Sequence, residues 1–73
     1  MKRKADMAYA GKMLRKLRGI RTRTGVAREL EMPYQTLQSY EDGKREPSGP
    51  TKKKLADYYG KPVKEIFFPE SNY

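Results

Sequence analysis

The segment from Arg23 to Gly43 carries two helical patterns separated by three residues, and it constrains the fold more than any other part of the chain. Apolar side chains recur at helical spacing on both sides of the interruption at residues 31–33, so each set can form one buried face. These apolar positions are Val26, Ala27, Leu30, Leu37 and Tyr40. The small side chain of Ala27 suits a point where two helices cross at a steep angle. The segment therefore predicts two short helices joined by a tight turn.

The second of these helices, expected over residues 33–41, keeps polar side chains on its outer face. They are Tyr34, Gln35, Thr36, Gln38 and Ser39. A helix-turn-helix places its second helix in the major groove, where glutamine can bond adenine with two contacts and hydroxyls can serve several bases. We therefore expect these five residues to read bases, with Gln35 as the main candidate. The alternative is a solvated polar face on a helix that binds another protein.

Basic residues are concentrated in the first part of the chain, which favours a polyanionic partner. The net charge is +8, and residues 1–28 contain ten Lys or Arg residues and one acid, Asp6. Charge by itself could also serve only to keep a small protein in solution. Together with the helix-turn-helix pattern, it predicts double-stranded DNA as the partner.

The length and composition argue against several other classes. A chain of 73 residues makes one small domain that buries only about 60% of its unfolded surface, too little to wall an enzyme cleft. It contains no Cys and no His, so we expect no disulfide, no metal site, no cofactor and no catalytic site. We also expect no second domain that could hold a small-molecule effector. No apolar run approaches the roughly 18 residues of a membrane span, so we expect a cytoplasmic protein without membrane contact.

The chain resembles the phage-repressor (Cro-type) helix-turn-helix family, also called the xenobiotic response element family. The family pattern of a polar residue, an aliphatic residue, Ala and a second aliphatic residue is met at Arg23, Val26, Ala27 and Leu30. The Glu-x-Gly-x-x-x-Pro sequence that ends the family's second helix is met at residues 41–47. The resemblance covers about residues 7–68 and implies an all-α, lambda-repressor-like bundle of five short helices. It leaves residues 1–6 as a basic N-terminal arm and residues 69–73 as a C-terminal tail.

Capping residues predict where several of these helices begin and end. Asp6, Thr22 and Ser48 can each accept a bond from an unsatisfied backbone amide, so they suit the starts of the first, second and fourth helices. Gly19 and Gly60 suit the ends of the first and fourth helices. The fifth helix should follow Pro62, with Val63, Ile66 and Phe67 facing inward. Glu31 stands where the family often has Gly, and a positive φ there would cost about 1 kcal/mol.

The resemblance also implies a structural ion pair. In the family, an arginine of the first helix and the glutamate that ends the recognition helix form a mostly buried pair. Leu14-Arg15 matches the family's Leu-Arg sequence if the following loop is one residue longer, so Arg15 is expected to pair with Glu41. The alternative is that both side chains are solvated.

Phosphate contacts are expected from basic and hydroxyl side chains that flank the two helices. Arg23 replaces a family Gln that touches phosphate, and an arginine can do so with charge as well. The other candidates are Arg21, Thr22, Lys44 and Arg45. Lys52, Lys53 and Lys54 either extend this track or form a solvated helix face, and residues 2–4 could reach around the duplex.

These features predict a sequence-specific DNA-binding transcriptional regulator, a repressor of phage or mobile-element origin. It would bind a palindromic operator as a homodimer, at least on DNA. Phe68 would either contribute to the dimer contact or fold back onto the core. The alternative is an antitoxin-like or regulatory protein-interaction module on the same fold, which an acidic or apolar recognition helix would have favoured.

Overall fold

The computed structural model describes residues 5–69, and this part of the chain forms five α-helices without a β-strand. The helices are α1 (Met7–Arg18), α2 (Arg23–Glu29), α3 (Tyr34–Glu41), α4 (Gly49–Tyr59) and α5 (Val63–Phe67). The expected all-α bundle is therefore confirmed. Most of the predicted basic arm, residues 1–4, and the tail from residue 70 onward lie outside the described residues.

Three helices begin with side-chain caps at the predicted residues. Asp6 accepts a bond from the backbone N–H of Tyr9 at 3.1 Å. Thr22 accepts one from Gly25 at 3.0 Å, and Ser48 caps α4 in the same way. Each cap satisfies a backbone donor that would otherwise lack a partner in the first turn, so these short helices start at defined residues.

The helices α2, α3 and α4 end in the same way, with a residue at positive φ. These residues are Glu31 (φ 57°), Gly43 (φ 73°) and Gly60 (φ 69°). After α2, the Met32 amide bonds the Ala27 carbonyl at 3.0 Å, which closes a Schellman motif. Corresponding bonds close α3 and α4. Glu31 therefore has a positive φ where the family often has Gly, at the cost of about 1 kcal/mol that a side chain incurs there.

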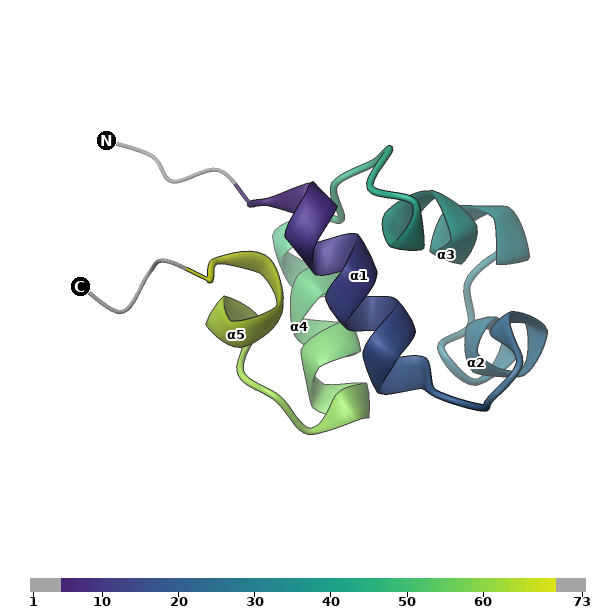
Figure 1. Cartoon of the computed structure of the whole chain (residues 1–73). Helices are drawn as coiled ribbons and strands as arrows, with labels where there is room; N and C mark the ends of the chain where they lie inside the picture. The colour runs from purple at the N-terminus through teal and green to yellow at the C-terminus, as the bar shows by residue number, and fades with distance from the viewer. Residues whose placement is uncertain (1–4, 70–73) are drawn as a thin grey trace.

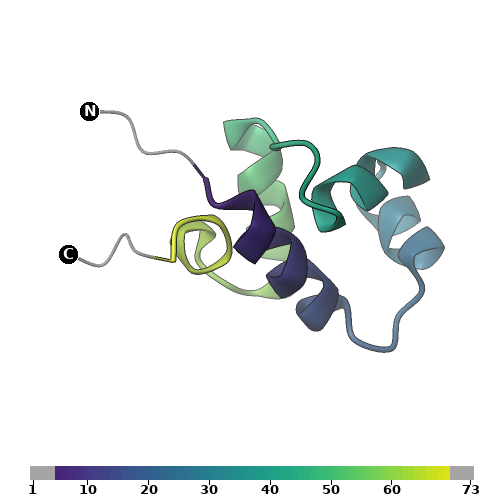
Figure 2. The same ribbon diagram turned by 45° about the horizontal axis from the view of Figure 1, so that its top comes forward.

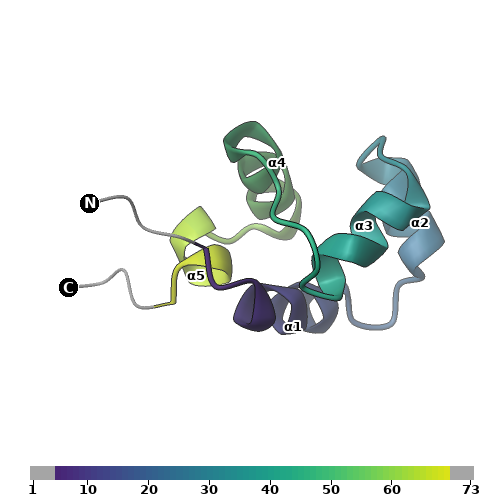
Figure 3. The ribbon, with the colours of Figure 1, turned by 90° about the horizontal axis from the view of Figure 1, so that it is seen from above.

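Helix α1 runs through the middle of the molecule, with α2 and α3 on one side of it and α5 on the other (Figure 1). The helices α2 and α3 stay side by side in the turned views, at the end of the molecule away from α5 (Figures 2 and 3). A backbone bond of 2.9 Å from the Asp6 amide to the Phe67 carbonyl joins the start of α1 to the end of α5. The helices α2 and α3 are thus supported by the other three helices.

One apolar core joins all five helices. Its buried members are Ala10, Leu14, Val26, Ala27, Leu30, Leu37, Tyr40, Leu55, Ala56, Ile66 and Phe67. Full burial of a large apolar side chain contributes about 1.5–3 kcal/mol to the stability of the fold. Ile66 and Phe67 therefore anchor α5, a helix of only five residues. Phe68 packs against this core, which is the second of the two positions expected for it.

Helices α1 and α3 meet at Gly11, where the two backbones come close together. A Cβ atom placed on Gly11 would lie 2.4 Å from the carbonyl oxygen of Glu41 and 3.2 Å from the amide nitrogen of Gly43. No side chain can occupy that space without movement of one backbone. The C-terminal end of α3 is therefore positioned by main-chain contact with α1.

Candidate nucleic-acid interface

The outer face of α3 carries the five residues predicted to read bases. Gln35 is exposed, Tyr34 is 42% exposed, and Thr36, Gln38 and Ser39 are partly exposed. The opposite face of the same helix is buried through Leu37, Tyr40 and Glu41. A helix that is anchored on one face and polar on the other is suited to lie in a major groove.

The candidate phosphate-binding residues lie in the loop after α3 and around the start of α2. Lys44 and Arg45 are exposed in the loop after α3, and neither forms an ion pair with another described residue. Thr22 is exposed, although its hydroxyl caps α2. Arg21 is exposed and its guanidinium carbon lies 5.5 Å from the centre of the Tyr58 ring. These four side chains are within reach of solvent, as a phosphate contact requires.

Arg23 is engaged within the protein. Its Nε donates to Glu41 Oε1 at 2.9 Å, and its Nη1 donates to the hydroxyl of Tyr34 at 3.2 Å. Its guanidinium also lies 5.7 Å from the centre of the Tyr34 ring. The side chain of Arg23 is only 20% exposed. It therefore links the two ends of the recognition helix, a role that sequence reasoning did not anticipate.

The predicted ion pair between Arg15 and Glu41 is wrong. Arg18 holds Glu41 with two bonds, from Nε to Oε2 at 2.9 Å and from Nη2 to Oε1 at 3.1 Å. Arg15 instead pairs with Asp42 at a more exposed position. The reason is helical register: Arg18 follows Ala10 and Leu14 at steps of four residues, so it continues the buried stripe of α1. That spacing was visible in the sequence, but the Leu-Arg match to the family favoured Arg15.

Glu41 is the only buried charged side chain in the described part of the chain. Its carboxylate has no exposed surface and is shared by two arginines, while Arg18 also donates to the carbonyl oxygen of Arg21 at 2.8 Å. Two charge-assisted partners compensate for the loss of solvation that burial imposes on a carboxylate. The cluster of Arg18, Arg23 and Glu41 therefore joins α1, α2 and α3 on the buried side of α3.

Tyr59 of α4 lies close to this cluster, and its hydroxyl is buried without a hydrogen-bond partner among the described residues. Burial, together with the negative charge of Glu41, raises the pKa of the Tyr59 phenol from its usual 10.0 to about 12. Burial acts in this direction because it disfavours the charged phenolate. The folded protein therefore keeps this proton at a pH where the unfolded chain loses it.

We expect Tyr59→Phe to remove part of the alkaline loss of stability. Below pH 10 the phenol is protonated in both states, so its contribution is constant there. Between about pH 10 and pH 12 only the unfolded chain releases the proton, so the wild-type free energy of unfolding falls by about 1–2 kcal/mol more than that of the variant. Urea unfolding at pH 9, 10 and 11 measures the difference. If the free energy of unfolding falls equally in the two proteins as the pH rises, Tyr59 does not titrate in this way.

The lysines of α4 are partly occupied by contacts within the protein. Lys52 pairs with Glu46 at 2.6 Å, and its ammonium lies 5.2 Å from the centre of the Phe68 ring. Lys53 pairs with Asp57, one helical turn further along. Lys54 is exposed. The suggestion that this run extends a phosphate track therefore applies best to Lys54.

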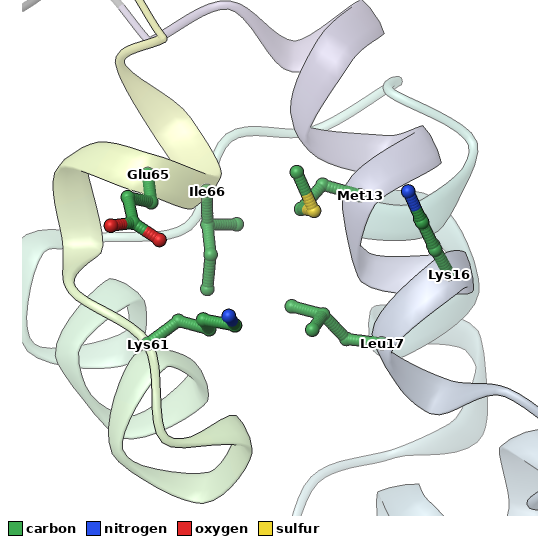
Figure 4. A pocket seen from close by; sticks show the side chains of 6 residues that line it. All are labelled: Met13, Lys16, Leu17, Lys61, Glu65 and Ile66. Carbon is green, nitrogen blue, oxygen red and sulfur yellow. The ribbon is translucent and has the colours of Figure 1, made fainter.

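A surface pocket lies between α1 and α5 (Figure 4). It has a volume of about 390 Å³ and is lined by Met13, Lys16, Leu17, Lys61, Glu65 and Ile66. None of the candidate DNA-contacting residues belongs to its lining. The pocket is therefore separate from the polar face of α3.

Among residues 5–69, no three His, Cys, Asp or Glu side chains are placed so that they could hold a metal ion together. No helix within the same residues has the length and apolar character needed to cross a membrane.

An all-helical domain in which α2 and α3 form a helix-turn-helix has the architecture of a major-groove DNA-binding module. A family model described as "Helix-turn-helix" (HTH_3) matches residues 12–66, which is more than half of the chain. The chain therefore belongs to this Cro/C1-type helix-turn-helix family. The family consists of DNA-binding regulatory domains and is not typically enzymatic. Among curated proteins, none matches the chain.

Proposed function

We propose that this protein is a transcriptional repressor that binds a specific double-stranded DNA sequence and reads the major groove with α3. Its membership of the helix-turn-helix family supports a DNA-binding regulator. Repression would follow from occupation of promoter DNA. The resemblance to the phage-repressor pattern supports an origin in a phage or another mobile element.

The observation that carries this proposal is the two-sided character of α3. Gln35 and its polar neighbours face solvent, while Leu37 and Tyr40 fix the opposite face in the core. Glutamine can make paired bonds to adenine, and each such pair discriminates between bases by about 1–3 kcal/mol. Lys44 and Arg45 stand in the loop that follows the helix, where phosphate contacts would set its orientation.

We further propose that the protein acts on DNA as a two-fold homodimer. One α3 helix covers only a few base pairs, so a single domain offers little specificity. Two copies would place their recognition helices in successive major grooves about 34 Å apart, on a palindromic operator.

Selection of bound duplexes from a randomised DNA pool at near-physiological salt tests the proposal. A palindromic motif with half-sites one helical turn apart is the expected result. Binding that depends strongly on salt and enriches no motif would overturn it, because the charge would then bind phosphate without reading bases. A partner protein would in that case be the leading alternative, as for an antitoxin-like interaction module.

We expect Gln35→Ala to weaken binding to the selected operator by about 30-fold to 10,000-fold, because one contact of about 1–3 kcal/mol is lost in each half-site, and to relax the preference at one base pair of each half-site. Arg45→Ala is the matched control for a phosphate contact. It should weaken binding evenly across sequences and lower the salt slope by about 2, because the homodimer loses one phosphate contact from each subunit. Titration of each variant against the operator and its single-base changes measures both effects. Unchanged base preferences in the Gln35 variant would contradict its assignment.

A further inference from the structure

Arg23 holds the first and last residues of the recognition helix at the same time. Tyr34 begins α3 and Glu41 ends it, and the two are seven residues apart, so they lie on nearly the same side of the helix. The guanidinium lies between them, with Nε bonded to Glu41 at 2.9 Å and Nη1 bonded to the Tyr34 hydroxyl at 3.2 Å. Glu41 is in turn fixed by Arg18 of α1. The orientation of Tyr34 is thereby tied to the core of the domain.

Packing alone would not fix the Tyr34 ring, because the residue is 42% exposed. Arg23 restrains the ring instead, because it donates a hydrogen bond to the Tyr34 hydroxyl and its guanidinium lies 5.7 Å from the ring centre. A side chain that is already ordered loses less rotational freedom when it meets a ligand. The Tyr34 side chain is therefore preorganised for a contact with a base before DNA binds.

Arg23 itself is poorly placed to bind a phosphate. Its side chain is 20% exposed, and its charge already faces the buried carboxylate of Glu41. A shift toward the DNA backbone would leave Glu41 with Arg18 alone and would release Tyr34. Lys44 and Arg45 are exposed and form no ion pair with another described residue, so they are free to bind a phosphate.

We propose that Arg23 is a positioning residue for base reading, which acts on DNA through Tyr34 rather than through a phosphate. This inference rests on the proposed function, because it assumes that α3 reads bases. It assigns to Arg23 a part in specificity that is distinct from electrostatic affinity. The base pair that faces Tyr34 is the one whose recognition depends on Arg23.

The test compares the wild type with Arg23→Gln, Arg23→Lys, Tyr34→Phe and the double variant Arg23→Gln/Tyr34→Phe. Each protein is titrated with the selected operator, with every single-base change of one half-site, and over a series of salt concentrations. Arg45→Gln serves as the phosphate control. Thermal melting confirms that each variant is folded, and Tyr34→Phe remains informative if the Arg23 variants unfold, because it leaves the bonds of Arg18 and Arg23 to Glu41 in place.

We expect Arg23→Gln to bind the operator about 3-fold to 10-fold more weakly and to lose preference at one base pair, with a salt slope close to that of the wild type. Arg23→Lys should lose the same preference although it keeps the charge, since an ammonium cannot span both partners. Tyr34→Phe should lose part of that preference, and the double variant should be no worse than Arg23→Gln, as expected for residues that act through one contact.

Two other results would overturn the inference. If Arg23→Gln lowers the salt slope by about 2, as Arg45→Gln should in a homodimer, and leaves every base preference intact, Arg23 binds phosphate. If the effects of Arg23→Gln and Tyr34→Phe add, the two residues act independently. A wild-type protein that enriches no motif overturns the proposed function as well, so the two failures are distinguishable.

Discussion

Glu41→Ala should destabilise the protein by about 3 kcal/mol, which lowers the melting temperature by about 12–24 °C for a domain of this size. The Glu41 carboxylate has no exposed surface and is the shared acceptor of Arg18 and Arg23. Its removal leaves two guanidinium groups close together without a counter-charge. The total stability expected for 73 residues is about 4–11 kcal/mol, so the loss is a large share of it.

Arg15→Ala is the matched control for this prediction. Arg15 is half exposed and pairs with Asp42, which also reaches solvent, so its loss should cost less than about 1 kcal/mol. Thermal and urea unfolding of the two variants beside the wild type measure the difference. A melting temperature that falls equally in both would mean that the buried carboxylate does not brace the three helices.

Gly11→Ala should also destabilise the protein strongly, by about 2–4 kcal/mol. In a free helix this change is favourable by about 1 kcal/mol, because alanine has the higher helix propensity. Here the added methyl group would lie 2.4 Å from the carbonyl oxygen of Glu41. The obstacle is backbone, so α1 and α3 must separate, and crowding of this kind typically costs 1–3 kcal/mol or more.

Gly49→Ala is the control for the helical glycine. A Cβ atom at Gly49 would meet no heavy atom within 4 Å, so this variant should be neutral or slightly stabilising. Relative to the wild type, the melting temperature should therefore fall for Gly11→Ala and stay the same or rise slightly for Gly49→Ala. A Gly11→Ala protein as stable as the wild type would show that α1 and α3 can shift apart freely.

The sequence predicted the helices well because each boundary is determined by nearby residues. Asp6, Thr22 and Ser48 cap helices where their side chains predicted. The positive φ of Glu31 agrees with the resemblance to the family, which often has Gly at this turn position. Local chemistry is sufficient for such features.

Contacts between helices were predicted less well, because they depend on crossing geometry that one-dimensional spacing does not contain. A two-residue match to the family predicts Arg15 as the partner of Glu41, whereas the three-dimensional path of α1 brings Arg18 to it. The close approach at Gly11 was not foreseen, since a glycine inside a helix is as often a simple weakness as a point of contact. The bond from Arg23 to Tyr34 joins two helices and has no signature in spacing.

The hydrogen bond between the Asp6 amide and the Phe67 carbonyl makes the five helices an almost closed ring. A linker of a few residues between these two positions would complete the ring with little strain. The chain could then be opened elsewhere, for instance beside Ile20, which is fully exposed between α1 and α2. We therefore expect a circularly permuted protein that begins at α2 to fold and to present the same α3.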